Sequence, residues 1–323
     1  MLHESIPPGE VSAEPTKEFF VEMLTRDIKL EQAVLDLVDN CIDGAKRLHP
    51  EPESRFDDYT VSIQFDTDVF SIIDNCGGFD IDTARKHAFR FGRADDHKSA
   101  PHSIGQFGVG MKRALFKFGR HFKVRSATSE EHWAIDIDVK KWGESVDWTF
   151  PWAEFGEEDV ISRKNPGTEI IVTELRQEIS TRFSTANFKT AIANLIKSKH
   201  RQFISSGLSI FVNDIQISAT NLYLCMTDKL KPGVDELIFS DDHKEDVRVR
   251  ITVGIGDSVP KDAGWNVICN GRLVLEADRR EDTGWGLLEV EANRLLIPSF
   301  HNQYARFRGI VSFDFIYDKL RSE

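Results

Sequence analysis

The sequence of 323 residues predicts an α/β fold. We expect a two-layer α/β sandwich with a mixed, mostly antiparallel sheet, followed by a second α/β domain. Helical patterns alternate with period-two strand patterns up to about residue 174, and the pattern then changes to one long helical segment followed by further strands. The predicted organisation is an arm over residues 1–15, a first domain over 16–174 and a second over 175–323, with the boundary near residues 174–183.

The composition is that of a soluble globular protein, with 40% apolar and 29% charged residues. A net charge of −12 argues against a generally basic nucleic-acid coat and leaves room for a local basic patch. We expect no membrane span, because no apolar run is long enough, and no signal peptide, because the N-terminus lacks the pattern of one. Four cysteines without a CxxC pair favour reduced thiols in a cytoplasmic protein.

The first domain begins with a helix over residues 17–24, for which Thr16 is the expected cap. A long helix then starts at Thr25 or Asp27 and runs to about Leu48, where prolines end it. The remaining elements follow in order. Strands are expected at residues 59–65, 69–73, 120–126, 132–139, 146–150 and 165–173, with helices at 80–90 and 111–118 and a loop over 92–110.

The second domain begins with a helical segment over residues 182–206. A hairpin over residues 208–218 is expected to turn near Asn213 and Asp214. Further strands are predicted at residues 247–254, 266–269 and 309–315.

The long helix carries an unusual polar stripe within residues 34–45. At about 100° per residue, six apolar residues share one side, and Asp36, Asn40 and Asp43 lie together on the other. Two carboxylates and an amide aimed one way indicate either a solvated helix face or an oxygen-rich site. The stripe alone leaves both interpretations open.

A predicted strand ends at Asp74 and leads into the string DNCGGFD. Gly77 and Gly78 permit positive φ and a close approach of a ligand to the backbone. A carboxylate held there can accept a hydrogen bond from an exocyclic amine, as adenine recognition requires. An ordinary turn between a strand and a helix is the alternative.

A glycine-rich stretch, SIGQFGVGMKRALFKFG, opens the helix predicted at residues 111–118. Gly105, Gly108 and Gly110 leave backbone N–H groups accessible to an anion such as phosphate. Lys112 and Arg113 follow in the first turn, where they either add positive charge to the site or are solvated. The spacing matches neither the P-loop nor the dinucleotide-binding fingerprint. Thr168, after Gly167, stands at the head of a later strand.

The order and spacing of these stretches resemble the GHKL ATPases, which share the Bergerat nucleotide-binding fold. DLVDNCIDGA resembles their N box, DNCGGF their first glycine box, GQFGVG their lid motif and GTEIIV their last motif. The lid string is similar to that of the ninety-kilodalton heat-shock chaperones. DNCGGF followed by AFRFGR and GVGMKRALFKFG is more similar to bacterial ATP-binding proteins related to MORC and MutL.

The resemblance implies ATP and Mg²⁺ as ligands. Asn40 would coordinate the metal, Asp74 would bind the adenine amino group with support from Thr168, and the Gly78 backbone would contact the base or ribose. Asp36 stands at the position of the general base. Lys112 would add positive charge near the phosphates. The lid would wrap the phosphates with residues Gly105, Gln106, Phe107, Gly108, Val109 and Gly110.

The chain departs from the family pattern at two positions. Asp36 replaces the usual glutamate and is shorter by one methylene, so we expect slow hydrolysis or hydrolysis that needs a partner. Cys76 stands where the family often has the first glycine, and Gly77 is expected to supply the flexibility instead.

Two functions fit these patterns. The first is a Mg²⁺-dependent ATPase, whose lid closes and which forms a homodimer when ATP binds, followed by a transducer-like domain and a DNA or protein client. The second is a nucleotide-gated binding module or chaperone-like scaffold with negligible turnover. A DNA track is one interpretation of the cations at Arg176, Arg182, Lys189, Lys197, Lys199 and Arg201, and a solvated helix face is the other.

Overall fold

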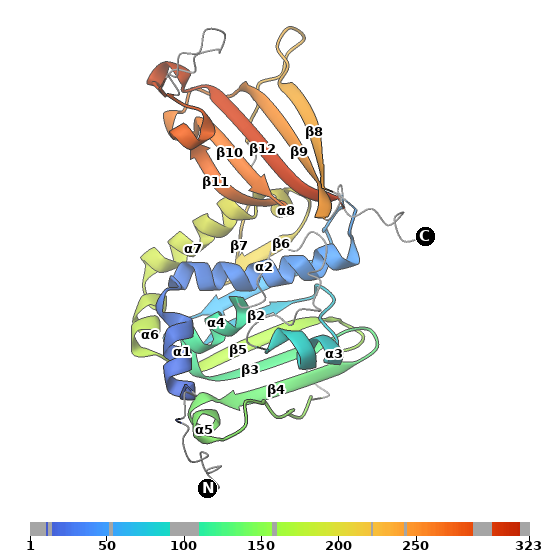
Figure 1. The fold of residues 1–323 in the computed structure, drawn as a ribbon, viewed down its shortest axis with the longest axis vertical. Coiled ribbons are helices and arrows are strands. Elements are labelled where there is room, and N and C mark those ends of the chain that lie inside the picture. Colours follow the sequence, from blue (N-terminus) through green and yellow to red (C-terminus); the bar gives the residue numbers. More distant parts are fainter. Residues whose placement is uncertain are drawn as a thin grey trace.

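The computed structural model describes residues 11, 15–51, 54–90, 110–156, 160–220, 222–241, 244–286 and 299–316. These residues form two sheets, with helices packed on the first sheet and between the two (Figure 1). The predicted α/β class is therefore confirmed.

The first sheet has seven strands in the order β4-β3-β5-β2-β1-β6-β7. All neighbours are antiparallel except β1 and β6, as the mostly antiparallel prediction requires. The strands are β1 (Thr60–Phe65), β2 (Phe70–Asp74), β3 (Gly119–Ala127), β4 (His132–Asp138), β5 (Gly167–Leu175), β6 (Ser209–Val212) and β7 (Ile215–Gln216).

Helices cover one face of this sheet, which makes the first unit a two-layer sandwich (Figure 1). Burial alternates along β1 and β2, so the inward face is apolar and the outward face carries residues such as Ser62 and Gln64. The helices are α1 (Lys17–Arg26), α2 (Leu30–Leu48), α3 (Ile81–Thr83), a π-helical turn (Ala84–Ala88), α4 (Gly110–Phe118), α5 (Val139–Glu144), α6 (Gln177–Phe183), α7 (Ala186–Lys199) and α8 (Arg201–Ser205). Within the described ranges, no helix has the length and apolar character needed to span a membrane.

The first sheet extends beyond the boundary that we expected near residues 174–183. After β5, the chain forms α6 and α7 and then adds β6 beside β1, in parallel register. The hairpin of β6 and β7 turns at Asn213 and Asp214, both of positive φ, as predicted. Apolar residues of α6 and α7, among them Ile179 and Ile192, are buried in the same core as α2. Local patterns do not reveal which sheet a later strand will join.

The second sheet has five strands in the order β11-β10-β12-β9-β8, with only β10 and β12 parallel. They are β8 (Gly233–Asp241), β9 (Lys244–Ile255), β10 (Gly264–Cys269), β11 (Arg272–Asp278) and β12 (Phe307–Ile316). We did not predict β8 and β11. The apolar residues Val234, Leu237 and Ile238 of β8 are all exposed, so no alternation of buried positions marks this strand.

Three predicted elements differ in the structure. Residues 146–150 form no strand. The Ser145 and Asp147 carbonyls accept hydrogen bonds from the Lys17 Nζ at 2.9 and 2.7 Å. The predicted long helix over 182–206 is divided into three helices, with Thr185 capping α7 and the buried His200 ending it. Helix α2 starts at Leu30, later than expected.

Phe183 tests whether α6 belongs to the core of the first unit. Its ring is fully buried and lies 4.9 Å from the ring of Phe65 and 5.9 Å from that of Phe70, measured between centroids. Phe183→Ala should lower the free energy of unfolding by about 3–5 kcal/mol, since it leaves a cavity. Urea unfolding measures this loss. The control is Phe19→Ala in the exposed part of α1, and equal, small losses in both variants would contradict the packing.

Candidate functional site

Helix α2 supplies the polar stripe of the site. All six residues predicted for its apolar side are buried: Val34, Leu37, Val38, Cys41, Ile42 and Ala45. In the stripe, Asp36 and Asn40 differ in environment, since Asp36 is partly buried and Asn40 is exposed. The Asn40 carboxamide forms no hydrogen bond with other residues that the structure describes, so it is available to a ligand.

Asp36 lies against the first residue of helix α4. A Cβ placed on Gly110 would be 3.0 Å from the Asp36 Cβ and 3.2 Å from its Oδ2. The Gln32 amide donates a hydrogen bond to Asp36 Oδ1 at 2.6 Å, one turn earlier on α2. The carboxylate is therefore held at the N-terminal end of α4, where backbone N–H groups favour anions.

The pKa of Asp36 is raised above its usual range. Burial is the main cause, and the negative charge of Asp39 adds to it. The hydrogen bond from Gln32 acts in the opposite direction, as do the positive charges of Arg272 and Arg113. A charge in the second sheet therefore influences the pKa of Asp36, because Arg272 belongs to β11.

Asp74 ends β2 and is buried. Its Oδ1 accepts a hydrogen bond from the Cys76 amide at 2.7 Å. Burial raises the pKa of this carboxyl, and hydrogen bonds from the Cys76 amide, the Cys41 thiol and the Thr168 amide oppose the rise. The structure therefore brings Asp74 together with Thr168, which is its register partner across β2 and β5.

The turn after Asp74 needs glycine for two reasons. Gly77 and Gly78 have φ of 85° and 59°, so Gly77 supplies the positive φ beside Cys76 as expected. A Cβ on Gly78 would lie 2.1 Å from the Ala127 carbonyl oxygen, so only glycine fits between this turn and β3. Arg47 of α2 donates to the Gly78 carbonyl and fixes the turn against the helix.

Ser126 is a residue of this site that the sequence did not single out. Its buried hydroxyl lies 3.1 Å from the Thr168 hydroxyl and accepts a hydrogen bond from the Phe79 amide at 2.9 Å. A pair of hydroxyls therefore stands beside the end of β2. A lone serine in a strand carries no signal that would have revealed this role.

Lys112 and Arg113 are anchored to the fold. Lys112 is buried, its Nζ donates to the Arg90 carbonyl oxygen, and burial lowers its pKa to about 8. Arg113 donates from Nε to the Leu24 carbonyl at 3.0 Å. The lid residues Gly105, Gln106, Phe107, Gly108 and Val109 lie outside the described residues.

A Mg²⁺ site can be assessed from the donors present. Among the described residues there is no group of three or more His, Cys, Asp or Glu side chains suited to a metal. Mg²⁺ is commonly held by one or two protein oxygens together with substrate phosphates and water, so a single exposed carboxamide at Asn40 fits this mode.

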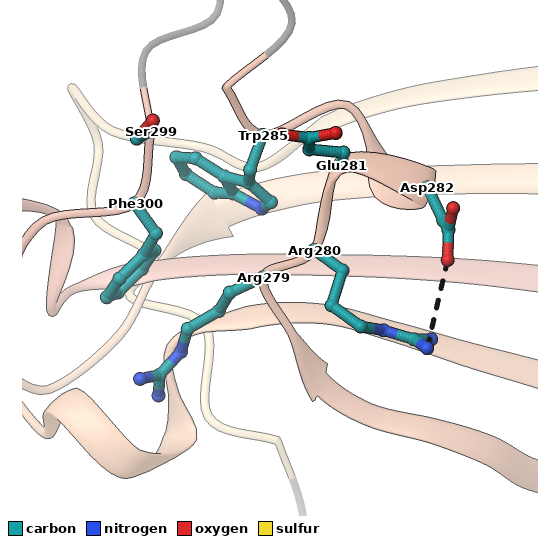
Figure 2. A pocket seen from close by; sticks show the side chains of 7 residues that line it. All are labelled: Arg279, Arg280, Glu281, Asp282, Trp285, Ser299 and Phe300. Atoms are coloured by element: carbon teal, nitrogen blue, oxygen red, sulfur yellow. Dashed lines mark ion pairs between the residues drawn. The ribbon is translucent and has the colours of Figure 1, made fainter.

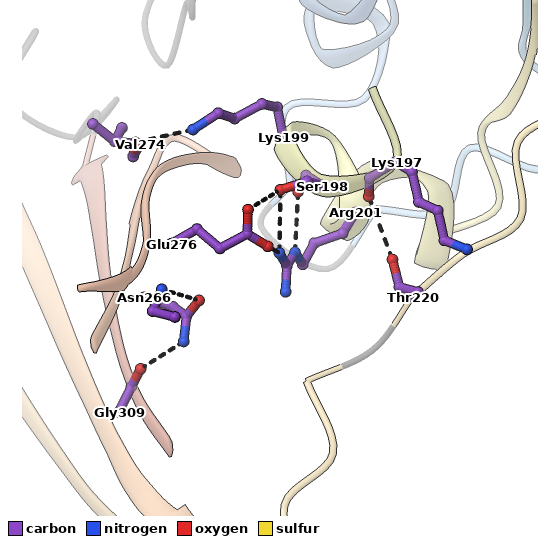
Figure 3. Close-up of polar contacts among 10 residues, drawn as sticks. Lys197, Ser198, Lys199, Arg201, Thr220, Asn266, Val274, Glu276 and Gly309 are labelled. Atoms are coloured by element: carbon purple, nitrogen blue, oxygen red, sulfur yellow. Dashed lines mark hydrogen bonds and ion pairs between the residues drawn. The ribbon is translucent and has the colours of Figure 1, made fainter. Parts of the chain in front are cut away.

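Four of the six cations that suggested a DNA track contact other groups of the protein. Arg182 pairs with Glu31, and Arg176 donates to the Phe116 carbonyl at 3.1 Å. Lys199 and Arg201 contact β11 (Figure 3). The DNA track stays a prediction.

A cavity of about 470 Å³ lies elsewhere, lined by residues that follow β11 and by Ser299 and Phe300 before β12 (Figure 2). Its arginines already have partners. Arg279 donates to the Ala263 carbonyl at 2.7 Å, and Arg280 pairs with Asp278 at 2.8 Å. This cavity is separate from the stripe of α2 and contains none of the predicted site residues.

Comparison with known proteins identifies the first unit. Residues 28–168 match a family model described as histidine kinase-, DNA gyrase B-, and HSP90-like ATPase. The matched span contains α2, the turn after Asp74, the N-terminal end of α4 and Thr168. No curated protein matches the chain. Residues 28–168 therefore belong to the GHKL superfamily of ATPase domains, a membership that supports ATP binding by this chain.

Proposed function

We propose that this chain binds ATP with Mg²⁺ along the polar stripe of α2 and hydrolyses the nucleotide slowly. The contact between Asp36 and Gly110 carries the proposal, because it sets a carboxylate at the N-terminal end of α4. A γ-phosphate held by backbone N–H groups at that end would be close to a water molecule bound by Asp36.

The adenine would bind at the other end of the stripe. Asp74 would accept a hydrogen bond from the exocyclic amine, with the hydroxyls of Thr168 and Ser126 beside it. Gly78, whose backbone packs too closely against β3 for any side chain, would contact the base or ribose through its backbone. Burial of these groups from water strengthens such hydrogen bonds.

Asn40 would hold Mg²⁺ through its carboxamide oxygen. When bound, the metal would neutralise charge on the phosphates. Asn40 would then orient the phosphates towards Asp36, which lies one turn earlier on α2. Asp43 is expected to act as a supporting residue on the same stripe.

In the hydrolytic step, Asp36 would accept a proton from water as the water oxygen attacks the γ-phosphorus. The bond from the γ-phosphorus to the bridging oxygen breaks, and ADP leaves with the electron pair. A raised pKa suits a group that must accept a proton. The short side chain supports slow turnover, since aspartate reaches less far than glutamate.

Closure of the lid, dimerisation on ATP binding and coupling to a DNA-related or protein client belong to the same proposal, and they rest on the resemblance to the GHKL family. The second candidate is a nucleotide-gated binding module with negligible turnover. It is favoured by the replacement of glutamate with Asp36. Phosphate release by the purified chain separates the two, since a module would bind ATP without releasing phosphate.

Asp74→Asn should weaken ATP binding about 10- to 100-fold, because a charged acceptor for the amine is lost. Calorimetric titration with ATP and with GTP measures the effect, which should be larger for ATP. Asp80→Asn is the matched control, since Asp80 caps α3 nearby with a side chain that asparagine can replace. Equal affinities for ATP in wild type and Asp74→Asn would exclude Asp74 from base recognition.

Removal of Mg²⁺ by a chelator should weaken ATP binding by wild type. In Asn40→Ala, affinity should be low with or without the metal, because the carboxamide ligand is absent. The measurement is the ratio of ATP affinities with Mg²⁺ and with chelator. A ratio in Asn40→Ala equal to that of wild type would show that the metal is held elsewhere.

Asp36→Asn should lower the rate of phosphate release about 10²- to 10⁴-fold and leave ATP affinity nearly unchanged, because an amide cannot accept the proton. Glu31→Gln is the control, as Glu31 lies on the same helix and pairs with Arg182. Turnover by Asp36→Asn at the wild-type rate would remove Asp36 from the mechanism.

A further inference from the structure

The hairpin formed by β10 and β11 docks on helix α2, the helix that carries the proposed ATP site (Figure 1). Lys46, near the end of α2, donates from Nζ to the Asn270 carbonyl in the hairpin turn at 3.1 Å. Gly271 of the same turn packs on the ring of Phe203 so closely that a Cβ would lie 2.4 Å from its Cζ. The second sheet is therefore anchored on both α2 and α8.

The centre of this contact is a buried carboxylate. Asp39 is 2% exposed and His200 is 0% exposed. The His200 Nε2 lies 2.7 Å from Asp39 Oδ1, and the Arg272 guanidinium pairs with Asp39 Oδ2. Both oxygens of an α2 side chain are thus bound by groups from other elements, one of them in the second sheet. A buried carboxylate is costly without such partners, so the three side chains hold one geometry.

Asp39 immediately precedes Asn40 on the helix. Successive residues on a helix point about 100° apart, so the side chain that faces the second sheet fixes the rotation of the one that faces the ligand. A turn or shift of α2 that released Asp39 would also move Asn40 and Asp36. The contacts of His200 and Arg272 with Asp39 therefore hold Asp36 and Asn40 in one orientation.

We propose that Arg272 and His200 are positioning residues for the Mg·ATP site, acting through Asp39, so that hairpin docking and Mg·ATP binding stabilise each other. This inference rests on the proposed function. Coupling between two sites is reciprocal: a hairpin that strengthens ATP binding by some factor is itself held more tightly by that factor when ATP is bound.

The same strand offers contacts that attach it to the first unit without touching α2 (Figure 3). Glu276 of β11 pairs with Arg201 and accepts a hydrogen bond from the Ser198 hydroxyl at 2.6 Å. Lys199 donates to the Val274 carbonyl at 3.1 Å. Loss of Arg201 therefore removes one contact of β11, while Ser198, Lys199 and both partners of Asp39 still hold the strand in place.

The first experiment compares Arg272→Gln with Arg201→Gln. ATP affinity is measured with Mg²⁺ and with chelator for each full chain. In Arg272→Gln the enhancement of affinity by Mg²⁺ should fall about 5-fold or more, in the range of known couplings, and in Arg201→Gln it should change less than 2-fold. The inference is overturned if Mg²⁺ raises the ATP affinity of Arg272→Gln by the same factor as in wild type, or if this factor falls equally in both variants.

The second experiment needs no variant and so does not depend on the folding of Arg272→Gln. Backbone hydrogen exchange of wild type is followed with and without saturating Mg²⁺ and a nonhydrolysable ATP analogue. Exchange over residues 264–278 should slow about 5-fold or more. Unchanged exchange there, with the analogue bound, overturns the inference alone. Absence of any ATP binding by wild type overturns the proposed function as well.

Discussion

The ion pair and hydrogen bond on Asp39 are the interactions on which the arrangement of this molecule depends. A carboxylate at 2% exposure has to be neutralised by close partners, and here they come from the end of α7 and from β11. Because His200 and Arg272 are distant from Asp39 in sequence, the contact joins the helix of the first unit to the second sheet. Helix α2 then has only one orientation that satisfies all three side chains.

Helix α2 consequently has three sides with different environments. Its apolar side fills the core of the first sheet, Asp39 faces the second sheet, and Asp36 and Asn40 face the proposed nucleotide. The core contacts and the contacts of Asp39 hold the helix, so Asp36 and Asn40 are positioned before any ligand binds. Such prior orientation is what a binding site needs if the cost of ordering its groups is not to reduce affinity. Asp36 is also affected by two other elements: Gly110 of α4 lies against it, and the positive charge of Arg272 in β11 lowers its pKa against the effect of burial.

Much of the site could be predicted because its signals are local. Glycines at positions 77 and 78 and an aspartate at the end of an alternating strand indicate a turn open to a ligand, and the turn has the expected positive φ values. The order of motifs indicated the superfamily, which the match over residues 28–168 confirms. Lys112 was less predictable. In sequence it follows the glycine loop like a phosphate ligand, but in the fold its side chain is 2% exposed and reaches a backbone carbonyl.

The sequence by itself determined the α/β class and the apolar and polar sides of α2, because each depends on periodicity or on residues near one another in the chain. The groups proposed to meet a nucleotide stay a prediction from local motifs. Only the tertiary structure decided that β6 returns to the first sheet and that β10 and β11 dock on α2. It also gave roles to Asp39, Ser126 and Arg272. Their partners are separated by tens to hundreds of residues, so the free energy that selects them comes from burial in the folded chain, which no local pattern records.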